Sequence, residues 1–209
     1  MPDPDHPAPY LSHYRALIDR VGATFEATGW RSREFQRERF RVFCEMQDFT
    51  GQRVIDAGAG QADFAAYLIE HGVSYEEVIA LDAMPEMVGA IAERELHRVT
   101  PRESDFASKP GVFMLFGPVD SIVFSGSLNT LTQDRALEVL ERAWDAARVS
   151  LVFNFLSDRA PEELLARPTL PAHRFSAQDL IDWALQRTPG VRFRQDYLGG
   201  HDATIAMLK

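Results

Sequence analysis

The residues best suited to chemistry lie together in one short stretch of the chain. Residues 54–64 read VIDAGAGQADF, in which an apolar run leads into Asp56, Gly58, Gly60 and Asp63. Glycines at such a turn let the backbone bend tightly and approach a ligand closely. The carboxylates of Asp56 and Asp63 disfavour a phosphate at this turn, because like charges repel. They favour a ligand that carries a positive charge.

The spacing within this stretch separates two classes of nucleotide-like ligand. A dinucleotide-binding turn has the pattern Gly-x-Gly-x-x-Gly or Ala, and its sixth position is Asp63 in this chain. S-adenosylmethionine carries an ammonium group, a sulfonium group and no phosphate, so it suits an acidic turn better. An NAD-dependent enzyme is the less favoured alternative.

Short apolar runs alternate with amphipathic helical patterns along most of the chain. Strands are expected near residues 53–56, 78–81, 98–105, 121–124, 151–156, 191–197 and 203–208. Strands that alternate with helices predict a parallel sheet covered on both faces. The last two strands are joined too closely for a crossover helix, so they must pair antiparallel. We therefore expect an α/β fold with a mostly parallel seven-stranded sheet, an antiparallel C-terminal hairpin and additional N-terminal helices.

Further motifs follow the ends of the expected strands. Asp82 ends the second strand within VIALDAMPEMV, Asp105-Phe106 follows the third, and the segment 125–129 (SGSLN) follows the fourth. Together with the turn at Asp56, this set resembles the motifs of class I S-adenosylmethionine-dependent methyltransferases, of the bacterial small-molecule type. The resemblance covers about residues 30 to 209. Two positions depart from the family pattern, because Ala62 replaces the third glycine and Ala80 replaces the usual glycine before Asp82.

The resemblance implies a Rossmann-like three-layer sandwich with S-adenosylmethionine as the cofactor. In the family, the glycine loop wraps the methionine part of the cofactor, and Asp56 would reach its amino group. Asp82 would accept both ribose hydroxyls, and Ala83 and Met84 would flank the adenine. The cofactor-binding residues expected in this chain are Asp56, Ala57, Gly58, Ala59, Gly60, Asp82, Ala83, Met84, Asp105, Phe106 and Ser125.

Several of these side chains also have a purely structural interpretation. Asp63 is better explained as a favourable charge in the first turn of a helix than as a ligand contact. Asp105 either contacts adenine or only closes the loop after its strand. Asn129 either faces the acceptor or caps the following segment, and the capping role is favoured. The pattern assigns no catalytic residue and no metal ligand, since no two histidines have metal-ligand spacing.

The chain divides into three parts. Residues 1–9 contain four prolines and are expected to form a disordered tail. Residues 10–49 are expected to form a helical lid or cap: helical spacing runs from Tyr10 to Phe25, and Ser32 can cap a second helix. Thr28-Gly29 could hinge this part, which either closes over a ligand or stays permanently packed. Residues 50–209 form the methyltransferase-like domain.

Composition excludes several other classes of protein. The chain has 209 residues and a net charge of −9, which disfavours binding to nucleic acid or to an anionic membrane. A single cysteine, Cys44, excludes an intramolecular disulfide and a thiolate zinc cluster. No apolar run is long enough to cross a membrane, and no signal peptide is evident, so a cytoplasmic location is expected.

These observations lead to one expected function and one alternative from another class. The expected function is transfer of a methyl group from S-adenosylmethionine to a small-molecule acceptor of unknown identity. Residues 125–128 read SGSL, not the Asn/Asp-Pro-Pro-aromatic motif of enzymes that methylate base amines, which argues against a DNA substrate. The alternative is a non-catalytic protein of the same fold that binds the cofactor in a regulatory role. The sequence leaves the oligomeric state open.

Overall fold

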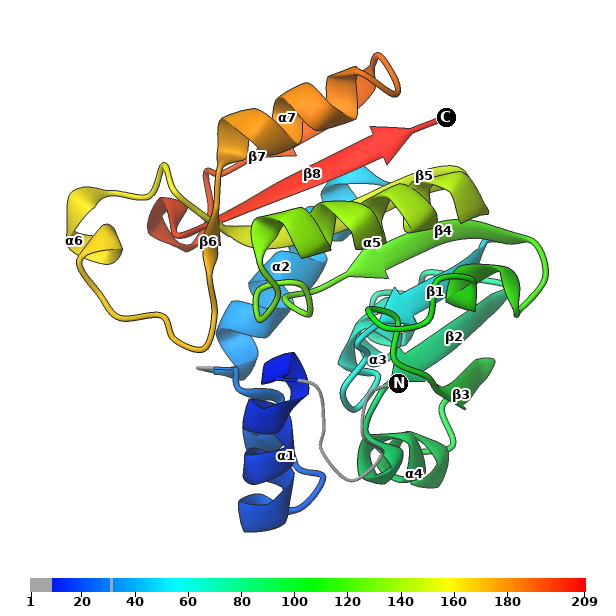
Figure 1. Cartoon of the computed structure of the whole chain (residues 1–209). Coiled ribbons are helices and arrows are strands. Elements are labelled where there is room, and N and C mark those ends of the chain that lie inside the picture. Colours follow the sequence, from blue (N-terminus) through cyan, green and yellow to red (C-terminus); the bar gives the residue numbers. More distant parts are fainter. Residues whose placement is uncertain (1–8, 31) are drawn as a thin grey trace.

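A twisted sheet organises the protein (Figure 1), whose computed structural model describes residues 9–30 and 32–209. The strands are β1 (Arg53–Ala57), β2 (Glu77–Asp82), β3 (Val99–Glu103), β4 (Val119–Phe124), β5 (Ala147–Ser157), β6 (Arg174–Phe175), β7 (Gly190–Arg194) and β8 (Asp202–Leu208). Seven of them follow the order β3-β2-β1-β4-β5-β8-β7, and the two-residue strand β6 pairs with the end of β5. The mostly parallel seven-stranded path is confirmed, and β6 is an addition that the sequence does not signal.

The direction of the strands brings the predicted motifs to one edge of the sheet. β1 pairs in parallel with both β2 and β4, and β4 pairs in parallel with β5. The carboxyl ends of these four strands therefore share an edge, and the chain order reverses between β1 and β4. Open α/β sheets bind ligands at such a switch point. β8 runs antiparallel to both β5 and β7, which confirms the predicted C-terminal hairpin.

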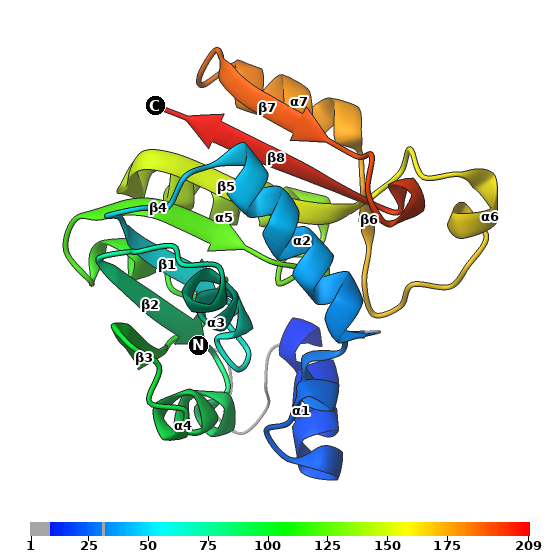
Figure 2. The same cartoon turned by 180° about the vertical axis from the view of Figure 1, so that it is seen from behind.

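Helices cover both faces of the sheet and complete the three layers. They are α1 (Pro9–Val21), α2 (Arg33–Met46), α3 (Asp63–Glu70), α4 (Pro85–Glu93), α5 (Gln133–Ala146), α6 (Glu162–Leu165) and α7 (Ala177–Leu185). Short 3-10 helices lie at η1 (Phe25–Thr28), η2 (Val112–Met114) and η3 (Leu198–Gly200). α5 and α7 cover one face (Figure 1), and α2 and α3 cover the other (Figure 2).

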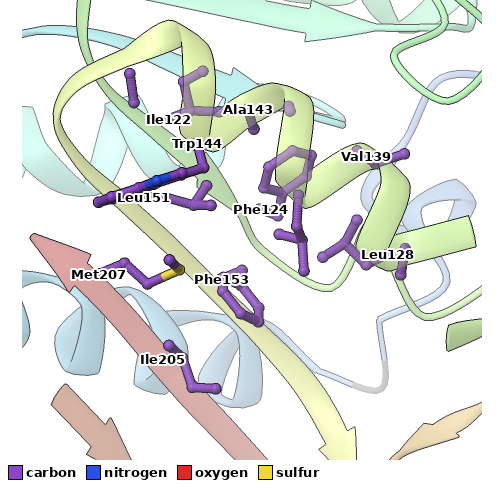
Figure 3. Close-up of a cluster of buried hydrophobic side chains, with 14 of the residues drawn as sticks. Ile122, Phe124, Leu128, Val139, Ala143, Trp144, Leu151, Phe153, Ile205 and Met207 are labelled. Atoms are coloured by element: carbon purple, nitrogen blue, oxygen red, sulfur yellow. The ribbon is translucent and has the colours of Figure 1, made fainter. Parts of the chain in front are cut away.

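The larger core lies between the sheet and the helices α5 and α7. Alternate residues of the central strands point into it, among them Phe124, Phe153 and Ile205, and α5 contributes Val139 and further apolar side chains (Figure 3). These side chains are fully buried. Register places Phe153 of β5 beside Phe124 of β4 and beside Ile205 of β8. This core therefore joins the parallel half of the sheet to the C-terminal hairpin.

A second core lies on the opposite face and includes α2. Phe40 and Phe43 of α2 pack with Phe64 of α3, and α2 also contacts β5 and β8. Ser32 caps α2 as predicted, because its hydroxyl oxygen accepts a hydrogen bond from the Phe35 amide at 3.3 Å. α2 belongs to the segment 10–49 that was expected to form a lid or cap. Its packing shows that it is part of one layer of the sandwich.

The first helical segment ends earlier than its periodicity predicts. α1 stops at Val21, Gly22 adopts a left-handed conformation with φ +70°, and Phe25 belongs to η1. A left-handed glycine commonly terminates a helix, because only glycine adopts this conformation without steric cost. At the other end, Pro9 is the first residue of α1, so the expected tail 1–9 is too long by this residue. Residues 1–8 lie outside the described part of the chain.

We predict that Phe153→Ala lowers the free energy of unfolding by about 3–5 kcal/mol, because it leaves a cavity where α5 meets the sheet. Phe193→Ala is the matched control: Phe193 lies on the edge strand β7 and is 38% exposed, so its removal should cost clearly less. Urea unfolding of both variants measures the difference. Equal losses would contradict the assignment of Phe153 to the main core.

Candidate functional site

A cavity of about 500 Å³ opens at the carboxyl edge of the sheet. The loops after β1, β2, β3 and β4 form one side of it, and α1, η1, α2 and the segment 167–172 complete its wall. Ten predicted cofactor-binding residues line this cavity: Asp56, Gly58, Ala59, Gly60, Asp82, Ala83, Met84, Asp105, Phe106 and Ser125. The remaining one, Ala57, is buried at the end of β1, where its carbonyl oxygen accepts a hydrogen bond from Ser127 Oγ at 2.5 Å.

The loop after β1 is held against its neighbours by backbone contacts. The amides of Gly58 and Ala59 both donate to the carbonyl oxygen of Leu81, at 2.8 and 3.0 Å. Gly58 has φ +81°, and a Cβ atom there would lie 2.3 Å from Cβ of Ser127 in the loop after β4. Glycine is therefore required at this position, because the loops after β1 and β4 approach too closely for any side chain.

Ala62 and Asp63 explain how the chain departs from the family pattern. Ala62 has the left-handed φ of +58° that a third glycine would adopt freely, and it is completely buried. Asp63 begins α3, forms an ion pair with Arg94 at 2.7 Å and does not line the cavity. This agrees with its interpretation as a charge in the first turn of a helix. Arg94 compensates it, so Asp63 adds less negative charge to the cavity than the sequence suggests.

The carboxylate of Asp82 ties together the loops after β1 and β2. Its Oδ2 accepts a hydrogen bond from the Gly60 amide, and its Oδ1 accepts one from the Met84 amide, both at 2.9 Å. Burial raises the pKa of Asp82 to about 6, although these amides oppose the shift. The side chain thus carries its charge near neutral pH and fixes the loop geometry.

Asp56 lies beside Asp82 at the end of the neighbouring strand β1. Its side chain is almost completely buried, and its pKa is raised to about 7. Burial is the largest cause of this shift, and repulsion from Asp82 and then from Asp63 contributes to it. Ionisation of both carboxylates is costly in the free protein, so a cation placed between them would be bound favourably.

Asp105 has the loop-closing role that the sequence left open, and it also contacts α1, while its contact with adenine stays a prediction. Its Oδ1 closes the loop after β3 by accepting hydrogen bonds from the amides of Ala107 and Ser108, at 2.9 and 3.2 Å. Its Oδ2 accepts a hydrogen bond at 2.5 Å from the hydroxyl of Tyr10, on α1. The pKa of Tyr10 is raised, first by burial and then by this contact with Asp105. Asp105 therefore holds α1 against the cavity.

The loop after β4 is supported from inside the sheet. Asn154 of β5 is fully buried, and its Oδ1 accepts a hydrogen bond from the Gly126 amide at 2.7 Å. Asn129 Oδ1 accepts one from the Leu156 amide at 3.3 Å, so Asn129 joins this loop to β5 while also lining the cavity. His173, which the sequence places before the last helix, is exposed and outside the main cavity.

Trp30, Arg39 and His201 are among the cavity residues that were not predicted as site residues from the sequence. The ring of Trp30 lies so close to Gly126 that a Cβ atom there would be 2.2 Å from Cη2 of Trp30. The guanidinium of Arg39 stacks on the ring of Trp30, with its Cζ 4.2 Å from the ring centroid. Only the glycine of the SGSLN motif hinted at this contact, because Trp30 and Arg39 belong to patterns that are also typical of ordinary helix packing.

Two other kinds of site find no support in the described part of the chain. No group of three or more His, Cys, Asp or Glu side chains there could hold a metal ion. Of the helices described, none is both long and apolar enough to cross a membrane.

Solved structures with the same fold are methyltransferases. Magnesium protoporphyrin IX methyltransferase (ChlM) from Synechocystis PCC 6803, with bound SAH, has a TM-score of 0.67 and 15% identity over 95% of this chain and 94% of that chain. A SAM-dependent methyltransferase from Archaeoglobus fulgidus has a TM-score of 0.65 and 18% identity, over 85% and 95% of the two chains. The DhpI–SAM–HEP complex has a TM-score of 0.66 and 17% identity, over 94% of each chain.

The fold is thus the class I S-adenosylmethionine-dependent methyltransferase fold, as the motifs predicted. The sequence itself matches no protein-family model and no curated protein. The identities to the solved structures are low, so the likeness establishes the fold and leaves the residue roles to the geometry of this site.

We predict that Asp56→Asn stabilises the protein at pH 8. The folded-state pKa of about 7 lies above the ordinary value of 3.8, so the folded protein holds this proton more tightly than the unfolded chain does. Stability is therefore lost as pH rises from about 4 to about 7, by up to about 1.4 kcal/mol per unit of pKa shift. The asparagine removes this loss.

Urea unfolding at pH 5 and pH 8 checks this prediction, with Asp145→Asn on the exposed face of α5 as the control. The gain from Asp56→Asn should be larger at pH 8 than at pH 5. A gain that is equal at both pH values, or a loss at pH 8, would contradict a raised pKa.

Proposed function

We propose that this protein binds S-adenosylmethionine and transfers its methyl group to a small-molecule acceptor. The observation that carries the proposal is the pair of buried carboxylates, Asp56 and Asp82, beside a glycine loop at the switch point of a methyltransferase fold. Both have raised pKa values. A ligand with an ammonium and a sulfonium group would relieve their repulsion, whereas a pyrophosphate would increase it.

Each part of the cofactor has a suitable surface in the cavity. Asp56 would attract the ammonium group, and Gly58 and Gly60 would allow the methionine part to lie against the backbone. Asp82 would accept the ribose hydroxyls. An ionised carboxylate has about four acceptor positions, so the two amides that it already binds leave room for the hydroxyls.

The adenine would lie between the loop after β2 and the loop after β3. Ala83 and Met84 of the loop after β2 and Phe106 of the loop after β3 all line the cavity, and the Phe106 ring also packs edge-on against Phe124 at 5.4 Å. Apolar side chains on two sides suit a flat heterocycle. Asp105 keeps one oxygen near this position, and that oxygen is bound by Tyr10 in the free protein.

In methyl transfer, the protein has to align the acceptor with the methyl group and to exclude water from the site. When bound, S-adenosylmethionine supplies an electrophilic methyl group on its sulfonium. The cavity walls hold the acceptor in line with that group, which removes the entropic cost of a bimolecular encounter. We assign no general base, because one is needed only for an acceptor that is protonated at the working pH.

The cavity supports a small-molecule acceptor. It is walled by α1 on one side and by the segment 167–172 on another, and the chain's net charge of −9 disfavours nucleic acid. ChlM, which has the same fold at 15% identity, is a magnesium protoporphyrin IX methyltransferase. The non-catalytic alternative would bind S-adenosylmethionine without turnover. Incubation with the methyl-labelled cofactor and a small-molecule extract separates the two functions, because only the enzyme releases labelled product.

We further propose that α1 and η1 act as the lid. They dock on the cofactor loops through a small apolar cluster that includes Ile18, Ala27, Met84 and Met87 and is separate from the two main cores. This segment also contacts the helix that follows the loop after β2, through the ion pair of Arg15 with Glu86 of α4 at 2.6 Å. A segment attached mainly to the cofactor loops can open without disrupting the sheet.

We predict that Asp82→Asn weakens binding of S-adenosylhomocysteine by at least about tenfold. A hydrogen bond to a charged acceptor contributes roughly 1.5–3 kcal/mol, and the amide loses both the charge and one acceptor oxygen. Asp63→Asn is the matched control, because Asp63 is ion-paired with Arg94 and lies outside the cavity. Titration calorimetry measures both variants and NAD.

An unchanged affinity of Asp82→Asn with an intact melting transition would remove Asp82 from the ribose site. Binding of NAD in place of S-adenosylhomocysteine would contradict the proposed function as a whole.

We predict that the amides of residues 10–28 exchange with deuterium quickly in the free protein and slowly once S-adenosylhomocysteine is bound. The ligand would sit beneath α1 and restrain it, while the amides of residues 151–156 in β5 should stay protected in both states. Hydrogen-exchange mass spectrometry gives the comparison. Strong and equal protection of residues 10–28 in the two states would show a permanently packed segment.

A further inference from the structure

The cavity divides into an acidic half and a basic half. The carboxylates that line it are Asp56, Asp82 and Asp105, and all three come from the ends of β1, β2 and β3. Arg39, Arg167 and His201 also line the cavity, and they come from α2, the segment after α6 and the turn before β8, elements that lie away from β2 and β3 (Figure 1). This second half is the part of the cavity that the proposed cofactor would leave free for the acceptor.

Arg39 is an unusual residue for the wall of a small-molecule cavity. It is only 5% exposed. Its Nη2 forms an ion pair at 2.5 Å with Oδ2 of Asp202, which is fully buried at the start of β8. Its Nη1 donates a hydrogen bond to the carbonyl oxygen of Phe35 at 3.2 Å. The contact with Asp202 is an ion pair and not an aligned hydrogen bond.

Arg39 Nε has no hydrogen-bond partner among the described residues. A buried donor without a partner is costly, because it has lost its hydrogen bond to water. A buried ion pair also costs more in desolvation than a pair of apolar residues in the same place would. Arg39 lines the cavity, and its Nε is buried just behind the cavity wall without a partner among the described residues, so a ligand that reached Nε by a small shift of the wall and accepted its hydrogen bond would recover part of this cost.

The surroundings of Arg39 select the shape of such a ligand. Trp30 stacks on the guanidinium at 4.2 Å and itself lines the cavity. Tyr14, Leu131 and Leu156 add further apolar surface to the same cavity. Burial raises the pKa of Tyr14 to about 12, so its hydroxyl stays neutral. A planar guanidinium suits a planar oxyanion, and the aromatic wall suits a flat apolar body.

We propose that the methyl acceptor carries a carboxylate on a ring-bearing apolar body, and that Arg39 binds this carboxylate through Nε. This inference rests on the proposed function and specifies the substrate class of the same site. Asp202 holds the guanidinium in place from behind, and Trp30 covers its face. The acidic half of the cavity repels the carboxylate, so the opposite charges of the two halves orient cofactor and acceptor toward one another.

The test uses the full chain saturated with S-adenosylhomocysteine and two matched pairs of probes. The pairs are benzoate with benzamide and phenylacetate with phenylacetamide, which differ in charge at nearly the same shape. Saturation-transfer NMR should detect the carboxylates at low millimolar concentration, with the amides bound at least about tenfold more weakly. Arg39→Lys should lose the preference for carboxylates while its affinity for S-adenosylhomocysteine stays unchanged.

Arg53→Lys is the matched control, because Arg53 is likewise ion-paired, with Glu77 at 2.7 Å, but is more exposed than Arg39 and lies at the amino end of β1, outside the cavity. If Arg39→Lys fails to fold, the double variant Arg39→Met with Asp202→Asn replaces it, since that variant leaves no unpaired charge. Either folded variant should lose the carboxylate preference.

Three results would overturn the inference: no carboxylate bound to the saturated protein, amides bound as tightly as carboxylates, or an Arg39 variant with unchanged preference. Failure of S-adenosylhomocysteine to bind is a separate outcome that calorimetry detects first. It would overturn the proposed function, and this inference with it.

Discussion

The whole site depends on one buried carboxylate. Asp82 accepts hydrogen bonds from the amides of Gly60 and Met84, so its side chain, together with the backbone hydrogen bonds to the Leu81 carbonyl, holds the loops after β1 and β2 together. Those loops enclose Asp56, which raises the cost of ionising both acids. Packing in the two apolar cores offsets the cost of burying these carboxylates, because it anchors β1 and β2 from both faces of the sheet. Functional sites commonly retain such local strain when the surrounding structure is rigid enough to impose it.

The parts of the fold that were predictable from the sequence are those in which local pattern and long-range packing agree. Apolar runs at β1, β2 and β5 had no competing interpretation, and Asp82 follows directly from the end of its strand. Ser32 was recognisable as a cap because capping depends on residues only three positions apart. The end of α1 was misjudged because Phe25 kept the helical spacing after Gly22 had already broken the helix.

Other features depend on contacts that no local pattern encodes. β6 is a strand only because its two residues meet the end of β5. Trp30 and Arg39 resemble ordinary residues of an amphipathic segment until the fold brings them to Gly126 and to Asp202, more than 90 positions away. Ala62 shows the opposite limit: the family pattern predicts a glycine, and the structure keeps the left-handed backbone with alanine. The sequence can locate such a departure but cannot tell whether the backbone has changed.

The position of Asn154 has a consequence for how this protein can change during evolution. In the sheet, β5 lies between β4 and β8, and its fully buried Asn154 links it to the loop after β4. The loops after β1 and β2 belong to the first half of the chain, whereas β8 and the segment after α6 belong to its last part. Distant substitutions without shared partners usually have additive effects on stability, so mutations that reshape β8 and the segment after α6 are expected to have little effect on the loops after β1 and β2. A chain organised in this way can acquire a new acceptor while its cofactor loops remain untouched.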